Sequence, residues 1–256
     1  MTAAPLLNIV VPMAGRGSRF AHAGYRDPKP LISFGGRPMI QWVVENLRPS
    51  RPHRFIFLCL AEHLLRYPAL PSRLEVLCPG CVIVPVAEVT QGAACTVLLA
   101  RRFIDSDEAL MIANSDQFVE LAIDDYLRLL DDAHADGLIM TFRSNDPKWS
   151  YCRLRLDGTV AEVVEKQVIS NDATVGIYNF SRGRDFVVAA DAMITRDLRV
   201  NGEFYVAPVY NLLIERGAHI ISALIRSDGN GMHGFGTPND LRLFLQTDVF
   251  RRLSAN

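Results

Sequence analysis

The residues best suited to chemistry stand early in the chain, in VVPMAGRGSRF (10–20) and in DPKP (27–30). The two glycines of the first stretch let the backbone adopt positive φ angles and approach a ligand closely. Arg16, Arg19 and Lys29 add positive charge beside that bare backbone. Because guanidinium, ammonium and backbone N–H groups all bind phosphate oxygens, these stretches predict a polyphosphate site.

Two familiar phosphate-binding loops do not account for this turn. A P-loop needs the pattern GxxxxGK[ST], which the chain lacks. A dinucleotide-binding loop needs GxGxxG and an acidic residue about 20 residues further on, whereas GRGSRF lacks the third glycine. The sequence also shows no arrangement typical of a Ser or Cys nucleophile. We therefore expect chemistry that depends on positioning and charge neutralisation.

Short aliphatic runs alternate with helical patterns through the first half of the chain. Such runs, when they end at glycine, proline or polar residues, predict buried strands. Strands that alternate with helices predict an α/β fold with a mostly parallel sheet covered on both faces. The expected strands are 6–13, 54–60, 81–86, 109–116 and 137–142, and the expected helices are 39–47, 94–104 and 122–135.

The second half of the chain has a different pattern. Residues 153–166 alternate around a DG turn, as in a β-hairpin, and 173–180 predicts a further strand. No stretch rich in glycine, proline or serine separates the two halves. We therefore expect a single domain over 1–256, with a nucleotide-binding half at about 1–145 and an acceptor-binding half at about 146–256.

Composition and charge narrow the classes of function. Hydrophobic residues make up 49% and charged residues 21% of the 256 residues, which predicts a folded core. The formal net charge of −1 offers no global attraction to nucleic acid or to an anionic membrane, and no apolar run approaches the roughly 18 residues of a membrane helix. The N-terminus does not look like a signal peptide, so the five cysteines are expected to be reduced and the protein cytoplasmic.

The polyphosphate motif leads to a family resemblance. PMAGRGSRF followed by PKPL resembles the signature of the sugar-phosphate nucleotidyltransferases. Further strings resemble later motifs of that family, in the same order: TQGAACTVLLA, IANSDQ, EVVEK, TVGIYNF, NGEFYVAPVYN and GFGTPNDL. The resemblance implies a Rossmann-like GT-A fold and an enzyme that joins an NTP to a phosphorylated acceptor with release of pyrophosphate. The strings are most similar to a subgroup from capsule and surface-polysaccharide loci.

The resemblance also implies roles for individual residues. Arg19, Lys29 and Asp116 are the expected catalytic residues, and Asp116 is the expected Mg²⁺ ligand. Gln91 would read the base, and because an amide offers both a donor and an acceptor, we expect a pyrimidine NTP. The full nucleotide-binding set is Met13, Ala14, Gly15, Gly17, Gln91, Gly92 and Ser115, and the acceptor-binding set is Glu165, Lys166, Gly176, Tyr178 and Glu203.

One departure from the family pattern leaves the metal site open. Many members carry an aspartate two residues before the tripeptide GTP, where this chain has Gly234. Asp228 or His233 is an alternative second ligand, and water and phosphate oxygens are another, because Mg²⁺ commonly retains several waters.

Two other functions compete with the nucleotidyltransferase. A GT-A glycosyltransferase that uses a nucleotide sugar normally holds its metal with D-x-D, whereas this chain has Asn114-Ser115-Asp116. A non-catalytic nucleotide-binding module is the third reading, supported by the missing metal ligand. The expected partners are an NTP and a phosphorylated small molecule, with a homodimer as one option for the assembly.

Overall fold

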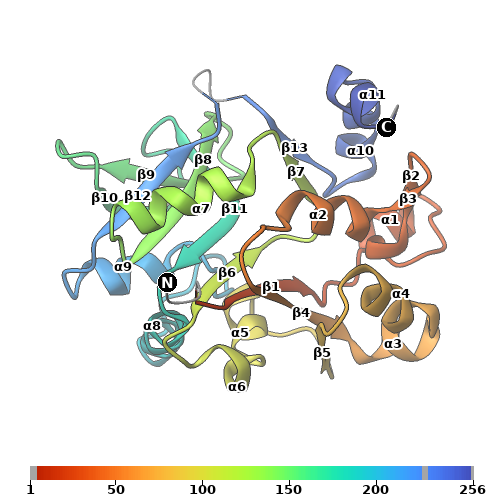
Figure 1. Ribbon diagram of the computed structural model, residues 1–256, viewed down its shortest axis with the longest axis horizontal. Coiled ribbons are helices and arrows are strands. Elements are labelled where there is room, and N and C mark those ends of the chain that lie inside the picture. The colour runs from red at the N-terminus through yellow and green to blue at the C-terminus, as the bar shows by residue number, and fades with distance from the viewer. Residues whose placement is uncertain (1–4, 227–229, 255–256) are drawn as a thin grey trace.

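The computed structural model of the chain describes residues 5–226 and 230–254, and it is built around a nine-stranded sheet. Four neighbouring strands run parallel, which confirms the predicted α/β class with a mostly parallel sheet (Figure 1). In spatial order these are β5 (Val82–Val86), β4 (His53–Leu60), β1 (Leu7–Met13) and β6 (Ala109–Ala113).

The later strands extend the same sheet beyond β6. β11 (Asp172–Phe180) pairs antiparallel with β6 and with β8 (Gly137–Arg143), and β12 (Ile220–Leu224) runs parallel to β8. The start of β11 also pairs with the hairpin of β9 (Ser150–Leu154) and β10 (Val160–Glu165). Strands from both predicted halves of the chain therefore share one sheet.

Helices cover both faces of this sheet, as alternating side chains in β1 require. Leu7, Ile9 and Val11 point into one hydrophobic cluster, and Val10 points into the other. The first cluster is covered by α2 (Met39–Leu47), α4 (Ala69–Leu77), α7 (Ile123–Asp132) and α10 (Pro238–Leu245). The second is covered by α5 (Ala93–Leu98), α6 (Arg101–Ile104), α8 (Gly183–Thr195) and α9 (Val209–Ile214).

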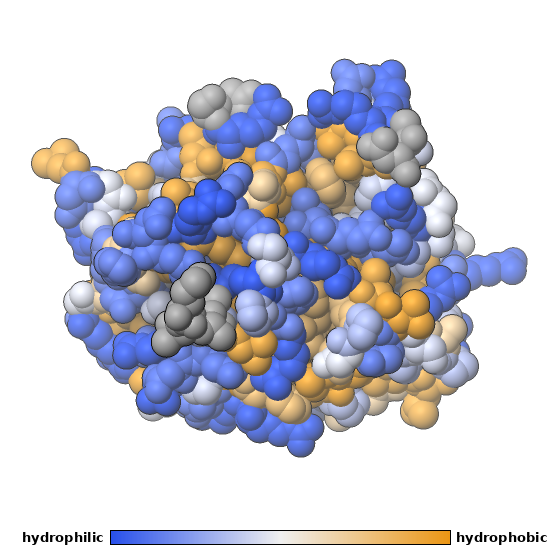
Figure 2. All heavy atoms as spheres, viewed as in Figure 1, coloured by the Kyte–Doolittle hydropathy of each residue, from blue (hydrophilic) through white to orange (hydrophobic). Residues whose placement is uncertain are grey.

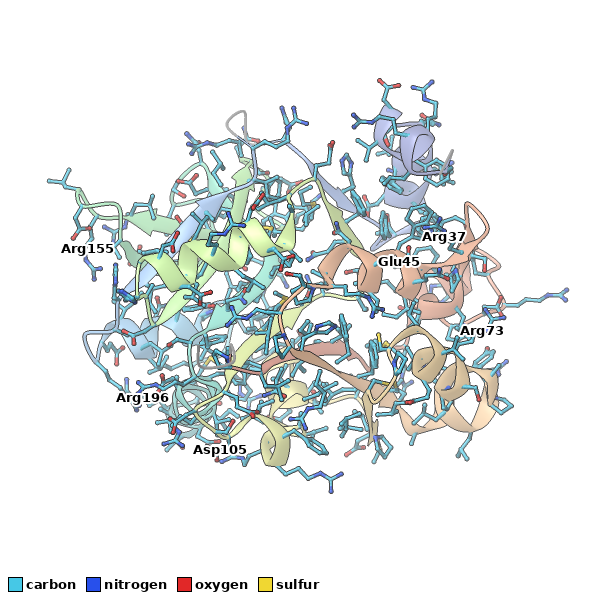
Figure 3. All side chains as sticks on the ribbon, in the orientation of Figure 1. Arg37, Glu45, Arg73, Asp105, Arg155 and Arg196 are labelled. Carbon is cyan, nitrogen blue, oxygen red and sulfur yellow. The ribbon has the colours of Figure 1, made fainter. Side chains whose placement is uncertain are left out.

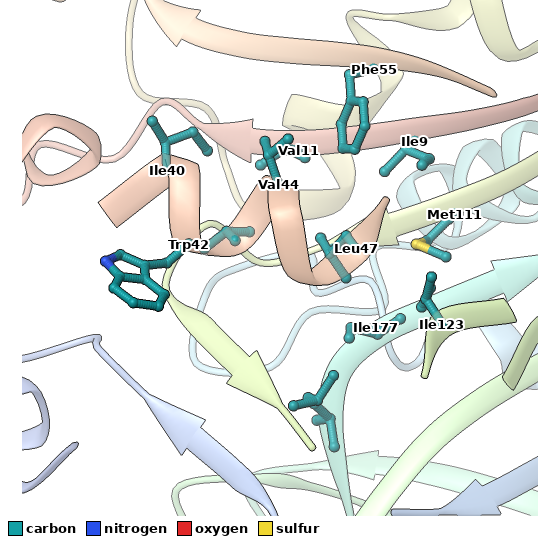
Figure 4. Packing of buried hydrophobic residues seen from close by; sticks show 14 of the residues in the cluster. Ile9, Val11, Ile40, Trp42, Val44, Leu47, Phe55, Met111, Ile123 and Ile177 are labelled. Carbon is teal, nitrogen blue, oxygen red and sulfur yellow. The ribbon is translucent and has the colours of Figure 1, made fainter. Parts of the chain in front are cut away.

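Helix α2 shows how the first cluster is packed. Its apolar residues Ile40, Val44 and Leu47 point toward Val11 of β1 and Phe55 of β4 (Figure 4). All five side chains are at most 2% exposed. This packing holds β1 and β4 in place, and with them the loops that follow the two strands.

Short elements complete the ends of the sheet. The remaining helices are α1 (Ser18–His22), the 3₁₀ turn η1 (Lys29–Leu31), α3 (Ala61–Arg66) and α11 (Asp248–Ser254). Two small antiparallel pairs join β2 (Ser33–Phe34) to β3 (Arg37–Pro38) and β7 (Gln117–Val119) to β13 (Met232–Gly234).

The predicted elements are confirmed, with corrections to several boundaries. The predicted helix 122–135 ends at Asp132. The predicted helix 94–104 is two helices, because Leu99 and Ala100 donate their backbone N–H groups three residues back, to Thr96 and Val97, and so tighten the chain into a turn. The predicted strand 109–116 ends at Ala113, and residues 114–116 leave the sheet.

Polar and apolar residues share the surface visible in Figure 2, and the five cysteines, which all lie in the described part of the chain, form no disulfide bonds. Hydrophilic residues cover much of the face shown in Figure 2, with hydrophobic residues visible between them. Within residues 5–226 and 230–254, no helix combines the length and hydropathy needed to cross a membrane. All five cysteines are free thiols.

Candidate nucleotide and acceptor site

The glycine turn joins the end of β1 to α1 through a left-handed residue. Gly17 has φ 63°, and a Cβ atom on it would lie 3.3 Å from the Cβ atom of Lys29. A larger residue would be strained there and would crowd Lys29. The glycine therefore lets the lysine of the DPKP stretch lie directly against the turn.

A pocket of about 410 Å³ opens between this turn and the residues that follow β6. β1 and β6 are adjacent parallel strands, so their carboxyl ends and the loops beyond them meet at one edge of the sheet. The structure thereby brings together most of the predicted catalytic and nucleotide-binding residues. The predicted residues that line the pocket are Met13, Gly15, Gly17, Arg19, Lys29, Ser115 and Asp116.

Opposite charges meet inside this pocket. Lys29 Nζ donates a hydrogen bond to Asp116 Oδ2, and the two side chains are 20% and 24% exposed. In contrast, Arg16 and Arg19 form no ion pair with any residue in the described part of the chain. The pocket therefore offers unpaired positive charge together with one carboxylate.

The C-terminal part of the chain forms the wall behind Asp116. β13 pairs with β7, and the Phe235 backbone N–H donates to the Asp116 carbonyl oxygen at 2.6 Å. A Cβ atom on Gly236 would lie 3.1 Å from Asp116 Oδ2. Because glycine has no Cβ atom, it leaves room at this position for the Asp116 carboxylate.

The residues present fit a magnesium ion held mainly by its substrate. Asp116 supplies one carboxylate in a pocket with room for phosphate and water, and Mg²⁺ often binds through one or two carboxylates. Gly234 lies opposite Gln117, and a Cβ atom on it would lie 4.0 Å from Met232 Cε. His233 Nε2 is bonded to Glu120 Oε1 at 3.0 Å, so it is engaged elsewhere. Asp228 lies outside the described residues.

A second pocket of about 240 Å³ adjoins the first on the α5 side. Ala14, Gly15, Gly92 and Glu203 line it, together with Asn114, which lies between the two pockets. This arrangement places the predicted base loop next to the predicted phosphate pocket. It also places Glu203 on the nucleotide side, rather than only among the acceptor residues.

Gly92 holds the base loop against the segment that carries Glu203. Its φ is 132°, and a Cβ atom there would lie 2.4 Å from the Phe204 carbonyl oxygen. Two backbone hydrogen bonds flank it, from Phe204 N to Gln91 O at 2.8 Å and from Ala94 N to Phe204 O at 3.0 Å. Only glycine permits so close an approach of the two backbones.

Gln91 does not line either pocket. Its side-chain oxygen accepts a hydrogen bond from Arg199 Nη2 at 2.8 Å. The side chains that face the smaller pocket beside Gly92 are Thr90 and Thr96, whose hydroxyl oxygens lie 2.6 Å apart. Sequence reasoning missed these threonines, although both stand in the string TQGAACT that carried the base-loop prediction.

Two of the predicted acceptor residues, Glu165 and Lys166, lie at the end of β10. Glu165 is buried, accepts a hydrogen bond from Ser150 Oγ, and has a pKa raised by burial. Lys166 Nζ donates to the hydroxyl of Tyr205, which raises the lysine pKa. Tyr205 was not predicted, although it stands in the recognised string GEFYVAPVYN.

Gly176 and Tyr178 lie in the irregular middle of β11. Gly176 has φ 89°, and a Cβ atom there would lie 2.1 Å from Asn114 Nδ2. The Asn114 backbone N–H donates to the Gly176 carbonyl oxygen at 3.0 Å. The Tyr178 hydroxyl is buried and bonded to Thr174 Oγ1 at 2.9 Å. Gly176 therefore connects the predicted acceptor strand to the wall between the pockets, whereas Tyr178 is held in the core.

The buried Glu165 gives a prediction about stability and pH. Because burial raises its pKa in the folded protein, the ionised carboxylate costs stability once the pH rises above its unfolded value. We expect Glu165→Gln, which can still accept from Ser150, to stabilise the protein at pH 7 by on the order of 1 kcal/mol. The gain should vanish near pH 4. Urea unfolding at both pH values measures it, and a pH-independent difference would contradict it.

This chain is similar in sequence to known proteins. Residues 9–195 match the family model described as nucleotidyl transferase. The chain is 27% identical to the bifunctional protein GlmU of Thermotoga maritima and 29% identical to that of Burkholderia thailandensis, over 80% and 84% of its length. It spans only 44% and 46% of the length of these relatives.

Solved structures share the fold over nearly the whole chain. A nucleoside-diphosphate-sugar pyrophosphorylase from Vibrio cholerae RC9 superposes with a TM-score of 0.77 at 25% identity, covering 93% of this chain and all of that one. The inositol-1-phosphate CTP transferase of Thermotoga maritima superposes at 0.71 with 14% identity, covering 99% and 96% of the two chains, and shows the fold alone. With the family model matched over most of its length, this chain belongs to the nucleotidyl transferase family.

Proposed function

We propose that this protein transfers the nucleotidyl group of an NTP to a sugar 1-phosphate or a similar phosphorylated acceptor and releases pyrophosphate. The observation that carries the proposal is the convergence of Arg19, Lys29 and Asp116 on one pocket beyond the ends of β1 and β6. The family membership and the Vibrio cholerae relative support the same reaction class.

The reaction needs positioning and charge neutralisation more than acid–base chemistry. An oxygen of the acceptor phosphate attacks the α-phosphorus, and the bond from that phosphorus to the bridging oxygen of the β-phosphate breaks. A phosphate monoester has a second pKa near ~6, so at neutral pH it is already mostly dianionic and needs no general base. Pyrophosphate leaves with the electron pair of the broken bond.

Positively charged side chains would bind the phosphates, and the Asp116 carboxylate would bind the metal ion. Arg19 and Lys29 neutralise the triphosphate, and Arg19 stabilises the charge that grows on the leaving pyrophosphate. Bound Mg²⁺, held by Asp116 and phosphate oxygens, would supply further charge neutralisation. The Lys29–Asp116 ion pair suits this exchange, because each partner can turn to a substrate group of opposite charge.

The acceptor would bind at the end of β10, beside Glu165 and Lys166. Lys166 offers a cation for its phosphate, and Glu165 offers a carboxylate for its hydroxyl groups. Glu203 lies near both, since its charge acts on the pKa of Glu165 and of Lys166. The acceptor is therefore proposed to carry both a phosphate and hydroxyl groups.

The choice of base and the biological role are part of the proposal. The pocket beside Gly92, with a volume of about 240 Å³, is the proposed site for the base of a pyrimidine NTP. The motif strings similar to capsule and surface-polysaccharide loci suggest a role in making precursors of such polymers. A cytoplasmic location fits the five free thiols.

Thermal unfolding with each NTP and its NDP, with and without Mg²⁺, tests the proposed function. A ligand at about 100 times its Kd adds about 2.7 kcal/mol of stability, which is readily visible as a Tm shift. We expect the largest shift with one pyrimidine triphosphate and Mg²⁺, larger than with its diphosphate. A stronger response to the diphosphate would favour a glycosyltransferase, and no response to any nucleotide would contradict the proposal.

A further inference from the structure

A separate cavity of about 430 Å³ lies on the far side of the glycine turn from the base pocket. Its walls come from α1, from the loop before η1 and from α3, which follows β4. Figure 1 shows α1 and α3 at the same end of the sheet, where β1 and β4 finish. The cavity shares Arg16, Gly17 and Lys29 with the phosphate pocket, so the two spaces meet at these residues.

The arginines of this cavity are not held in ion pairs within the described part of the chain. Arg26 and Arg66 line this cavity but not the phosphate pocket, and together with Arg16 they form no ion pair with any residue of 5–226 or 230–254. Other arginines on the surface vary in this respect, since within the described residues some are paired with carboxylates and others, such as Arg73, are not. Arg37 lies 2.8 Å from Glu45 (Figure 3). Arg196 lies 2.7 Å from Glu215.

The walls of the cavity are held by specific contacts. The Tyr67 hydroxyl donates to the Arg26 carbonyl oxygen at 2.9 Å, which ties α3 to the loop before η1. Tyr25 packs edge-on against buried Phe20, with ring centroids 5.2 Å apart. The Arg66 guanidinium lies 5.6 Å from the centre of the Tyr67 ring. These contacts give the cavity a defined shape.

The charge of the lining suits a small polyanion. Four cationic side chains face the cavity, and Asp27 and Glu62 are its only carboxylates among the lining residues. Lys29 is paired with Asp116. Within the described residues, the unpaired positive charge of the lining is therefore that of Arg16, Arg26 and Arg66, and Arg16 stands at the boundary with the phosphate pocket. An anion that leaves the phosphate pocket past Arg16 and Lys29 would meet further cations rather than bulk water.

We propose that this cavity is a second polyphosphate site, which takes up inorganic pyrophosphate as it leaves the phosphate pocket. The inference rests on the proposed function, because that reaction generates pyrophosphate when the bond from the α-phosphorus to its bridging oxygen breaks. The volume of 430 Å³ exceeds that of the bare anion and leaves room for ordered water. In this proposal Arg26 and Arg66 bind pyrophosphate but not the NTP, whereas Arg16 and Lys29, which line both spaces, also contact the NTP.

The test replaces Arg26 and Arg66, which line this cavity but not the phosphate pocket. Titration calorimetry of Arg26→Ala/Arg66→Ala with inorganic pyrophosphate, with and without Mg²⁺, gives the Kd of the product without any acceptor or turnover. We expect this Kd to rise about tenfold or more, since hydrogen bonds to charged groups are among the stronger ones. The Kd of the Mg²⁺-bound NTP should change by less than about twofold.

A matched control removes the same charge from elsewhere. Arg73→Ala/Arg216→Ala deletes two exposed arginines that line neither pocket, and it should leave both Kd values unchanged. If Arg26→Ala/Arg66→Ala lowers the Tm, Arg26→Gln/Arg66→Gln is measured in its place, because glutamine removes the charge and keeps a polar side chain.

Several results would overturn the inference. An unchanged pyrophosphate Kd in the Arg26/Arg66 variants would show that the cavity does not bind the product. Equal weakening of pyrophosphate and NTP would make the cavity part of the triphosphate site. Failure of the proposed function has a different signature, because the wild-type protein would then bind no NTP at all.

Discussion

Replacing Arg19 with alanine is expected to lower kcat for nucleotidyl transfer by about 10²–10³-fold, or to abolish detectable turnover. Arg19 lines the phosphate pocket, where its charge would stabilise the leaving pyrophosphate. The side chain is exposed and makes no ion pair within the described part of the chain, so the fold should be unaffected. Steady-state kinetics with release of pyrophosphate as the readout, together with a Tm measurement, checks both parts.

Two further variants sharpen this result. Arg19→Lys keeps the charge without the planar guanidinium, so it should recover only part of the rate. Arg73→Ala removes an exposed arginine of α4 that lines neither pocket, and it should behave like the wild type. Wild-type rates in Arg19→Ala would remove the basis for assigning the glycine turn to the triphosphate.

Asp116→Asn is expected to lower kcat by at least about 10²-fold and to weaken the response of the rate to Mg²⁺. The substitution removes the carboxylate that faces the phosphate pocket and leaves Lys29 without its partner. Because the pair is partly exposed, stability should change by only about 1 kcal/mol or less. Rates measured across a Mg²⁺ titration, with urea unfolding in parallel, separate the two effects.

Asp240 provides the matched control for Asp116. It lies on α10 near the same wall, since a Cβ atom on Gly236 would be 3.8 Å from Asp240 Oδ2 and 3.1 Å from Asp116 Oδ2. Its carboxylate accepts a hydrogen bond from Thr237 Oγ1 at 2.7 Å, at the start of the helix. Asp240→Asn should therefore keep the rate. Equal loss of activity in both variants would instead identify Asp240 as a second metal ligand.

Local sequence patterns determined much of the fold. The helix predicted over 39–47 matches α2 residue for residue, and the predicted strands match β1, β4, β5 and β8 to within one residue at each end. These elements are set by hydrophobic periodicity and by proline and glycine at their ends, which are properties of neighbouring residues. The expected turn with Gly17 in a positive φ conformation is local in the same sense.

Motifs in the sequence that resemble those of the nucleotidyl transferases also indicated several residues of the phosphate pocket. The structure shows that β1 and β6 are adjacent parallel strands, so the glycine turn after one strand and the polar residues after the other meet at one edge of the sheet. Arg19, Lys29 and Asp116 meet in this way, although Lys29 and Asp116 are 87 residues apart in the chain.

Only the tertiary structure decided where individual side chains point. Gln91 turns away from both pockets toward Arg199, which comes 108 residues later, and Glu203 reaches the nucleotide side because Gly92 lets two backbones pair. The free guanidinium groups of Arg26 and Arg66 around one cavity depend on α3 packing beside the glycine turn. Sequence periodicity specifies burial and turns, whereas partners of polar side chains depend on long-range packing.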